Sequence, residues 1–159
     1  MDGHEYQLQP AEDTAFLYQV YASTRSDEMK RTGWSEVTIE QFLRFQFKLQ
    51  HVQYHNCYPN AAYFIICVGE DRVGRLYINR CESEIRVIDI SLLPEFRRKG
   101  LGTCIMNNLI KEAETAHLPL RLSVRFDNPA CHLYKRLGFC VANDGGYYLD
   151  MERTALKTL

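Results

Sequence analysis

The segment from Ile85 to Ala116 constrains the fold of this chain most, because it joins a strand, a short loop and a helix without interruption. Residues Ile85–Leu92 are mostly apolar and β-branched, which favours a strand. From Leu101 to Ala116, apolar residues recur at helical spacing. Another apolar run, Leu120–Val124, follows Pro119 and predicts a further strand. A strand–helix–strand order allows its two strands to pair in parallel, so we predict a mixed sheet.

The loop between this strand and this helix carries three basic residues and two glycines, Arg97-Arg-Lys-Gly-Leu-Gly102. Glycines allow a ligand to approach the backbone, and the first N–H groups of a helix lack partners and favour an anion. Thr103 adds a hydroxyl. The loop lacks the Gly-Lys-Ser/Thr ending of an ATP-binding P-loop, and one Gly-x-Gly is not a dinucleotide fingerprint. The pattern fits a pyrophosphate site, and a solvated basic turn that starts a helix is the alternative.

The rest of the chain predicts short elements on both sides of this segment. Before it we predict a strand over Tyr6–Gln9, a helix over Thr14–Ser23, a helix from a weak capping box at Thr38–Gln41, and a hairpin of Tyr63–Val68 and Val73–Asn79. After it we predict a helix that starts at Asn128–Pro129 and ends at Gly138, then a hairpin of Phe139–Ala142 and Tyr147–Glu152. No repeat or linker divides the chain, so we expect a single domain over residues 1–159.

Composition excludes several classes of protein. The 159 residues are 46% hydrophobic and 25% charged, as in globular domains, and a net charge of −1 argues against nucleic-acid binding. The longest apolar run, Ala61–Val68, is far shorter than the roughly 20 residues that span a bilayer, and the first residues are too polar for a signal peptide. Six cysteines without a CxxC pair fit reduced thiols. We therefore expect a cytoplasmic protein with no nucleic-acid or membrane partner.

A second motif, Asn128-Pro-Ala-Cys-His-Leu-Tyr-Lys-Arg-Leu-Gly-Phe139, follows the strand predicted at Leu120–Val124. Together with Leu92–Thr103 it resembles the two signature motifs of the GNAT superfamily of acyl-CoA-dependent N-acyltransferases. The hairpin at Val73-Gly74-Arg75 is similar to that family's third strand, and the residues before Tyr63 match only in their β-α-α order. The resemblance implies an α/β (α+β) fold with a mixed, mostly antiparallel sheet of about seven strands and about four helices. It also implies that the fourth and fifth strands splay apart and that acyl-CoA lies between them.

The resemblance further implies roles for individual residues. Asn128 would hydrogen-bond the pantetheine arm of acetyl-CoA, and Tyr134 would lie beside the thioester sulfur as a catalytic residue. As alternatives, Asn128 caps its helix and Tyr134 packs in the core. The other implied cofactor-binding residues are Arg97, Gly100, Gly102 and Thr103 with the backbone of Arg98, Lys99 and Leu101 for the pyrophosphate, and the backbone of Leu92 and Leu93 for the pantetheine.

The general base is the position at which this chain departs from the family's pattern. An amine must be neutral when it attacks, so a carboxylate or a water chain has to take its proton. Many relatives place a Glu six residues before the position of Leu92, and here that position is Arg86. Of the nearby carboxylates Glu84 and Asp89, Asp89 is the stronger candidate, because it lies inside an apolar run where an unpaired charge is costly. A carboxylate satisfied by a backbone group or an arginine is the alternative.

The resemblance implies an N-acetyltransferase that moves an acetyl group from acetyl-CoA, its co-substrate, to the primary amine of a small molecule or peptide. Arg86 keeps open a non-catalytic acyl-CoA-binding sensor as the alternative. In this fold class the early helices and the last hairpin, here Tyr18–Trp34 and Asn143–Tyr148, build the acceptor side. The aromatic residues there either line an amine pocket or form core: Tyr18, Tyr21, Trp34, Tyr147 and Tyr148. The sequence leaves open the identity of the acceptor, the length of the acyl group and whether the protein forms a homodimer.

No metal is expected. His51, His55 and Cys57 have a spacing that suits zinc, but the sequence offers no fourth ligand. Cys104 lies in the first turn of its helix, where a thiol is activated, but no partner histidine is indicated. We therefore expect neither a zinc site nor a catalytic cysteine.

Overall fold

The computed structural model describes residues 5–154, which fall into two compact units. The first unit contains the residues up to Tyr77 together with Asp89–Arg97, and the second contains Ile78–Ile88 together with the residues from Arg98 onward. One seven-stranded sheet takes strands from both units, in the order β1-β2-β3-β4-β5-β7-β6. Four α-helices accompany it within the described residues, which confirms the predicted fold class. The single domain over residues 1–159 stays a prediction.

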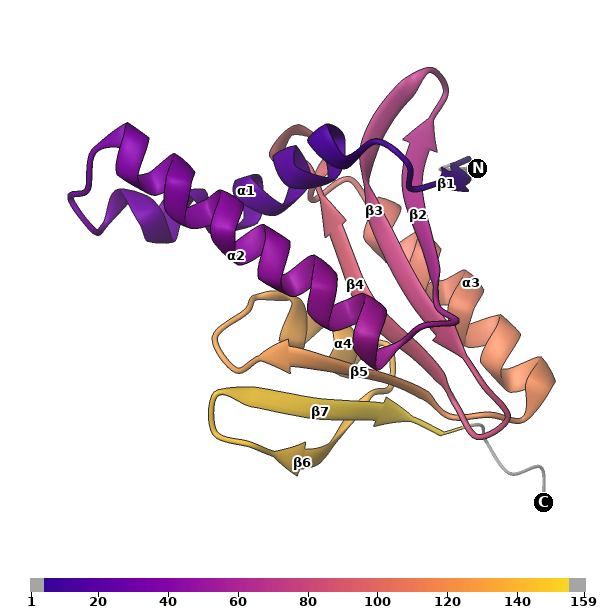
Figure 1. Cartoon of the computed structure of the whole chain (residues 1–159). Helices are drawn as coiled ribbons and strands as arrows, with labels where there is room; N and C mark the ends of the chain where they lie inside the picture. Colours follow the sequence, from indigo (N-terminus) through magenta and orange to yellow (C-terminus); the bar gives the residue numbers. More distant parts are fainter. Residues whose placement is uncertain (1–4, 155–159) are drawn as a thin grey trace. The chain divides into compact units, whose positions relative to one another are not determined.

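The first unit holds the two early helices and one side of the sheet. Its elements are β1 (Gln7–Pro10), α1 (Thr14–Lys30), α2 (Glu36–Cys57), β2 (Ala62–Val68), most of β3 (Asp71–Arg80), the second half of β4 (Ile85–Leu92) and a 3₁₀ turn (Pro94–Phe96). The helices α1 and α2 lie side by side (Figure 1). β1 pairs antiparallel with β2, with Leu8 opposite Ile66. The predicted strands and helices of this part are confirmed, with different ends.

Side-chain caps fix where both helices begin. Asp13 accepts a hydrogen bond from the Phe16 N–H at 3.1 Å, and Ser35 accepts one from the Thr38 N–H at 3.2 Å. The predicted start of α2 at Thr38 was wrong, because Ser35 has the extended backbone and the hydroxyl that an N-cap needs. α1 continues to Lys30, beyond the predicted Ser23, since helix-compatible polar residues follow its apolar part.

Only one side of α2 is buried. Leu43 and Phe47 pack in the core, whereas Phe45, Leu49 and Val52 are exposed by 59%, 49% and 50%. At about 3.6 residues per turn, these three side chains point away from the side that carries Leu43 and Phe47. The apolar spacing thus predicted the helix correctly, but half of the apolar positions do not belong to the core.

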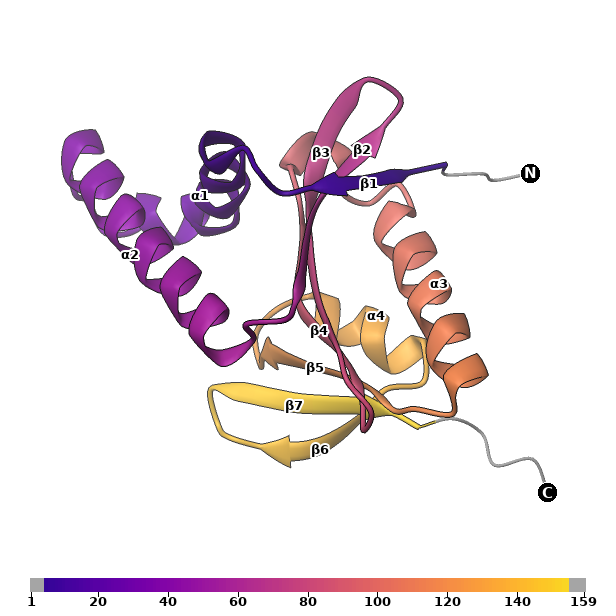
Figure 2. The same ribbon diagram turned by 45° about the vertical axis from the view of Figure 1, so that its right-hand side comes forward.

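The second unit contains the crossover. Its elements are the end of β3, the start of β4, α3 (Leu101–Ala116), β5 (Leu120–Arg125), α4 (Ala130–Arg136), β6 (Cys140–Asp144) and β7 (Tyr148–Arg153). Residues Ile85–Val87 pair in parallel with Leu120–Leu122, which confirms the predicted mixed sheet. β7 lies between β5 and β6 and is antiparallel to both (Figure 2).

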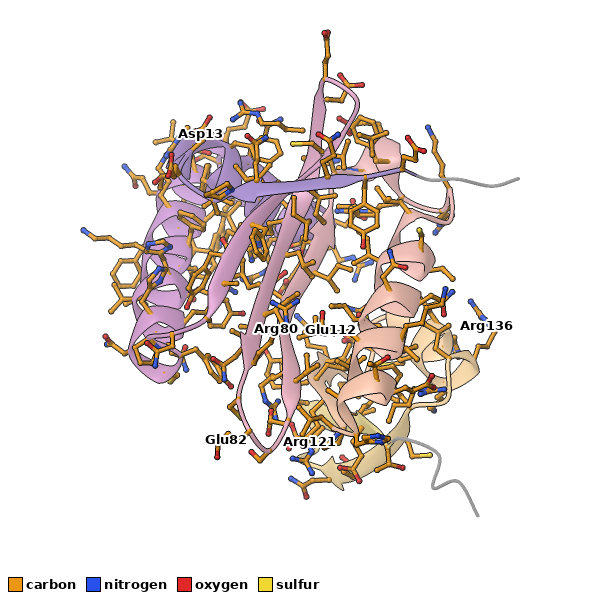
Figure 3. All side chains as sticks on the ribbon, turned by 90° about the vertical axis from the view of Figure 1, so that its right-hand side faces the viewer. Asp13, Arg80, Glu82, Glu112, Arg121 and Arg136 are labelled. Carbon is orange, nitrogen blue, oxygen red and sulfur yellow. The ribbon has the colours of Figure 1, made fainter. Side chains whose placement is uncertain are left out.

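The helices of this unit are fixed by packing, by surface ion pairs and by their ends. α3 buries Ile105, Met106, Leu109 and Ile110. Arg80 at the end of β3 points to Glu112 on α3 and donates two hydrogen bonds, of 2.6 and 2.9 Å (Figure 3). None of the helices within residues 5–154 has the length and apolar content of a membrane span.

The ends of α3 and α4 refine the predictions. α3 stops at His117, whose backbone is left-handed, two residues before Pro119. α4 begins at Ala130 and not at Pro129, which occupies the cap position, while the Asn128 side chain accepts from the Ala130 N–H at 2.9 Å. Gly138 has a φ of 96° and ends the helix as predicted.

Replacing Gly74 by alanine should destabilise the protein. The added Cβ would overlap the carbonyl oxygen of Ser91 and lie 2.9 Å from a Leu92 methyl carbon. Overpacking of this kind costs about 1–3 kcal/mol, because backbone atoms have to move. We expect Gly74→Ala to lower the urea midpoint. Gly102→Ala, whose Cβ meets no atom within 4 Å and which lies in a helix, should not lower it. Equal midpoints for wild type and Gly74→Ala would show that β3 and β4 are not this close.

Candidate functional site

The start of α3 has the geometry of an anion-binding site. Arg98 and Gly100 have positive φ angles of 60° and 86°, and Gly100 is the cap residue without a side chain to close the helix. The first intrahelical bond runs from the Cys104 N–H to the Gly100 carbonyl, at 3.0 Å. The N–H groups of residues 101–103 therefore lack a helical acceptor and lie at the positive end of the helix dipole.

Gly102 keeps this helix start open. A Cβ at this position would meet no atom within 4 Å, and the φ angle of Gly102 is not positive. Neither packing nor backbone conformation within the described residues therefore requires glycine here. Glycine at this position does, however, leave room for an anion to approach the backbone N–H groups closely.

The basic side chains beside the helix start differ in their contacts. Arg97 is exposed, and its guanidinium donates to the Leu92 carbonyl at 2.8 Å and to the Ser23 hydroxyl at 3.3 Å. The Leu93 N–H donates to Val73 of β3 at 2.8 Å. The Leu92 carbonyl, the Leu93 N–H and the Arg97 guanidinium, all predicted to bind acetyl-CoA, therefore have hydrogen-bond partners inside the first unit. Arg98 and Lys99 are exposed.

Asn128 and Tyr134 belong to the second unit, around α4. Asn128 is exposed and uses its side-chain oxygen for the helix start, which leaves its amide nitrogen without a partner among residues 5–154. Tyr134 is 7% exposed, and its ring lies 5.7 Å from that of Phe139. Both the ligand-binding and the structural interpretation of Asn128 are compatible with this arrangement, because each uses a different atom of the amide.

Asp89 forms a buried ion pair with an arginine, as the alternative interpretation of the sequence has it. Arg75 on β3, 2% exposed, donates to Asp89 at 2.6 Å and to Gln50 at 2.9 Å through the same nitrogen. The other Asp89 oxygen accepts from Ser91 at 2.6 Å. The remaining Arg75 nitrogens have no hydrogen-bond partner among the described residues, but the guanidinium lies 5.0 Å from the Tyr77 ring centre. Both oxygens of Asp89 are thus occupied in the structure.

Arg86, which replaces the expected glutamate, also belongs to an ion-pair network. It donates to Glu84 at 2.8 Å, and Glu84 also accepts from Arg121 at 3.3 Å. Arg121 in turn donates to Glu152 on β7 at 3.1 Å. The network crosses β4, β5 and β7 of the second unit. Arg86 thus has a structural partner, and it does not supply the acid that many relatives have at this position.

One carboxylate that the sequence did not single out lies next to this network. Asp150 on β7 is opposite Ser123 on β5, and the serine hydroxyl donates to it at 2.5 Å. The signal that was available is the alternation on β5, which exposes Ser123 between the buried Leu122 and Val124. Pairing with a strand 27 residues further on is not visible in such a local pattern.

The aromatic residues predicted for the acceptor side fall into two groups. Tyr18 and Tyr21 are buried in the first unit, and Tyr18 donates to Glu40 at 2.9 Å. Burial and then this hydrogen bond raise the pKa of Tyr18 to about 12, so it stays protonated. Trp34, Tyr147 and Tyr148 are about half exposed, at 47%, 51% and 53%.

The histidines on α2 stack on each other. The His51 and His55 rings lie 4.3 Å apart, and burial, followed by the charges of His55 and Arg75, lowers the pKa of His51. Within residues 5–154, no group of three or more His, Cys, Asp or Glu side chains is arranged to hold a metal ion.

Residues 12–139 match the sequence model of the acetyltransferase (GNAT) family. An N-alpha-acetyltransferase of Saccharolobus solfataricus is 28% identical over 137 residues, 74% of this chain and 78% of that enzyme. The ribosomal protein bS18-alanine N-acetyltransferase of Salmonella typhimurium is 36% identical over 74 residues, 45% of this chain and 50% of that enzyme. The structure of PaiA N-acetyltransferase from Thermoplasma acidophilum, in complex with coenzyme A, aligns with a TM-score of 0.68 at 19% identity, over 94% of this chain and 98% of that one. The structural likeness shows a shared fold.

The ion pair of Asp89 makes a prediction about stability. Removing one partner of a buried pair leaves the other charge uncompensated, at a cost of about 3–5 kcal/mol. Asp89→Asn should therefore lower the free energy of unfolding by about 3 kcal/mol in urea titrations. Adding Arg75→Met should recover part of this loss, because the stranded charge is then gone. A wild-type stability for Asp89→Asn would show that the pair contributes nothing.

Proposed function

The chain belongs to the GNAT acetyltransferase family, and we propose that it acetylates the free amino terminus of peptides or proteins. Family membership makes it an acyl-CoA-dependent N-acetyltransferase with acetyl-CoA as co-substrate. The relatives support the finer proposal, because they are N-alpha-acetyltransferases and an enzyme that acetylates the alanine of a ribosomal protein. A cytoplasmic location and a homodimer stay predictions from the sequence.

The shape of the last hairpin favours an extended acceptor. Phe126, Tyr147 and Tyr148 are all more than half exposed, and the Tyr147 ring lies 6.2 and 5.3 Å from the other two. Exposed aromatic side chains that contact each other form a platform typical of protein-binding surfaces. A platform open to solvent suits a chain that extends away from the site better than a small enclosed amine.

The open start of α3 is the observation that carries the donor side of the proposal. The N–H groups of Leu101, Gly102 and Thr103, with the Thr103 hydroxyl and the backbone of Arg98, Lys99 and Gly100, would bind the pyrophosphate of acetyl-CoA. Arg97, which donates to the Ser23 hydroxyl within the first unit, stays a prediction from the sequence for the same ligand. The bound donor supplies a thioester whose carbonyl carbon accepts the amine.

The remaining residues orient the reactants and move protons. The amide nitrogen of Asn128 is free to bind the pantetheine arm. The same role for the backbone of Leu92 and Leu93 stays a prediction from the sequence. Tyr134 is proposed to donate a proton to the leaving sulfur, because a phenol with an ordinary pKa near 10 is protonated at neutral pH. Asp89 stays a prediction for the base, and it would have to release a hydrogen bond to act.

Acetyl-CoA should raise the melting temperature, and Gly102→Glu should abolish that rise. A ligand that binds only the native state stabilises it by mass action, and a glutamate would put bulk and negative charge where the pyrophosphate binds. Since a Cβ at Gly102 would meet no atom within 4 Å, we expect the variant itself to fold, and its melting temperature without CoA checks this. Thermal scans with and without millimolar CoA check this, and an unchanged shift in the variant would place the phosphates elsewhere.

Tyr134→Phe should reduce turnover and leave CoA binding intact. The change removes the hydroxyl and little volume, so the buried ring still packs on Phe139. Loss of a general acid reduces kcat roughly 10²–10⁴-fold. Release of free CoA thiol gives the rate, and titration calorimetry gives the affinity for CoA. Wild-type turnover would make Tyr134 a packing residue, whereas equal losses of affinity and turnover would assign it to binding.

The acceptor class is tested with a panel of amines. The panel contains peptides of about six residues that differ in their first residue. The same peptides blocked at the amino terminus, in which a lysine side chain is the remaining amine, serve as controls. Small polyamines and aminoglycosides complete the panel. We expect acetylation of free amino termini, confirmed by mass spectrometry. Turnover with the small amines and none with the peptides would overturn the proposed acceptor but not the acetyltransferase activity.

A further inference from the structure

β5 and β7 have one buried and one accessible face within the second unit. Leu122 on β5 and its partner Met151 on β7 are buried. The next pair, Ser123 and Asp150, is exposed and half-buried respectively. Because side chains alternate along a strand, Ser123 and Asp150 lie on the face away from the core.

Asp150 is held there by neutral donors. The Ser123 hydroxyl donates to its Oδ1 at 2.5 Å, and the Asn143 side-chain amide lies 3.4 Å from its Oδ2. Asp150 makes no ion pair with any of residues 5–154. Two uncharged partners, on β5 and β6, therefore orient the carboxylate without neutralising it.

Three other carboxylates of the second unit have arginine partners. Glu84 and Glu152 bind Arg121, and Asp127 binds Arg125 at 3.1 Å. The two arginines that flank Ser123 on β5 are therefore engaged. A carboxylate without a cation is available to a ligand that brings a positive charge, because the two form a charge-assisted hydrogen bond.

We infer that Asp150, oriented by Ser123, is the residue that binds the ammonium group of the acceptor. This inference rests on the proposed function, in which an amine enters beside β5. An ammonium group has three donors and a full charge, and it forms a charge-assisted hydrogen bond with a carboxylate. The exposed aromatic platform of Phe126, Tyr147 and Tyr148 starts two positions further along the same strands, since Tyr148 pairs with Arg125.

The test compares Asp150→Asn with Glu152→Gln, a carboxylate on the same face that already has Arg121 as its partner. The acceptor is an alanine-initiated hexapeptide, or otherwise the amine of the panel that wild type acetylates. We expect Asp150→Asn to raise the KM for the amine about 10- to 100-fold, the effect of one charge-assisted hydrogen bond, and Glu152→Gln to change it less than about 3-fold. The KM for acetyl-CoA and the melting temperature should not move. Asp150→Glu should restore part of the affinity, because it restores the charge.

An acceptor that is neutral at pH 7, such as an aniline, separates recognition of charge from a structural role. The loss in Asp150→Asn should disappear with this acceptor, whereas a structural defect would reduce both reactions equally. An equal loss for the two acceptors, or a KM change no larger than in Glu152→Gln, would overturn the inference and leave the acetyltransferase activity standing. If wild type acetylates no amine at all, the proposed function fails first, and the role of Asp150 fails with it.

Discussion

The parallel pairing of β4 with β5 is the constraint on which the candidate site depends. Parallel neighbours cannot be joined by a tight turn, so the chain has to cross over between Val87 and Leu120 through a helix. That helix, α3, begins at Leu101 just after the end of β4, with three N–H groups that have no helical acceptor. The left-handed backbone at Arg98 and Gly100 turns the chain into the helix. An open helix start at this place is therefore a consequence of the strand order.

The distribution of arginines decides which carboxylates are available for a ligand. Asp89 is occupied by Arg75 in the first unit, and Glu84 and Glu152 are occupied by Arg121 in the second. Among residues 5–154, the side-chain partners of Asp150 are Ser123 and Asn143. The family's pattern concerns one position on β4, so it points to Arg86 and its neighbours as candidates for the acceptor side. The hydrogen bonds of the structure instead indicate Asp150 on β7, which lies beside the exposed Ser123 of β5.

Local signals were sufficient to predict most elements and the open start of α3, the proposed donor site. The apolar run Ile85–Leu92 predicted both ends of β4 correctly, and Gly138 predicted the end of α4. Both predictions succeeded because these ends depend on neighbouring residues only. The start of α2 was misplaced because Thr38 and Ser35 are both plausible caps. Partners far apart in the sequence were not predictable: Asp89 meets an arginine 14 residues away, and Asp150 meets a serine 27 residues away. The local pattern predicted the hairpins and the parallel pairing of β4 with β5, but it did not show that β7 lies beside β5.

A crystal structure with a bisubstrate ligand, in which CoA is joined to the amino terminus of a short peptide, tests the central claim most directly. The account predicts the pyrophosphate on the N–H groups of residues 101–103, the linking sulfur beside Tyr134 and the peptide chain leaving over Tyr147 and Tyr148. The peptide nitrogen is expected on the accessible face of β5, next to Asp150. Density for the pyrophosphate away from the start of α3, or for the peptide away from the β5–β7 face, would contradict it.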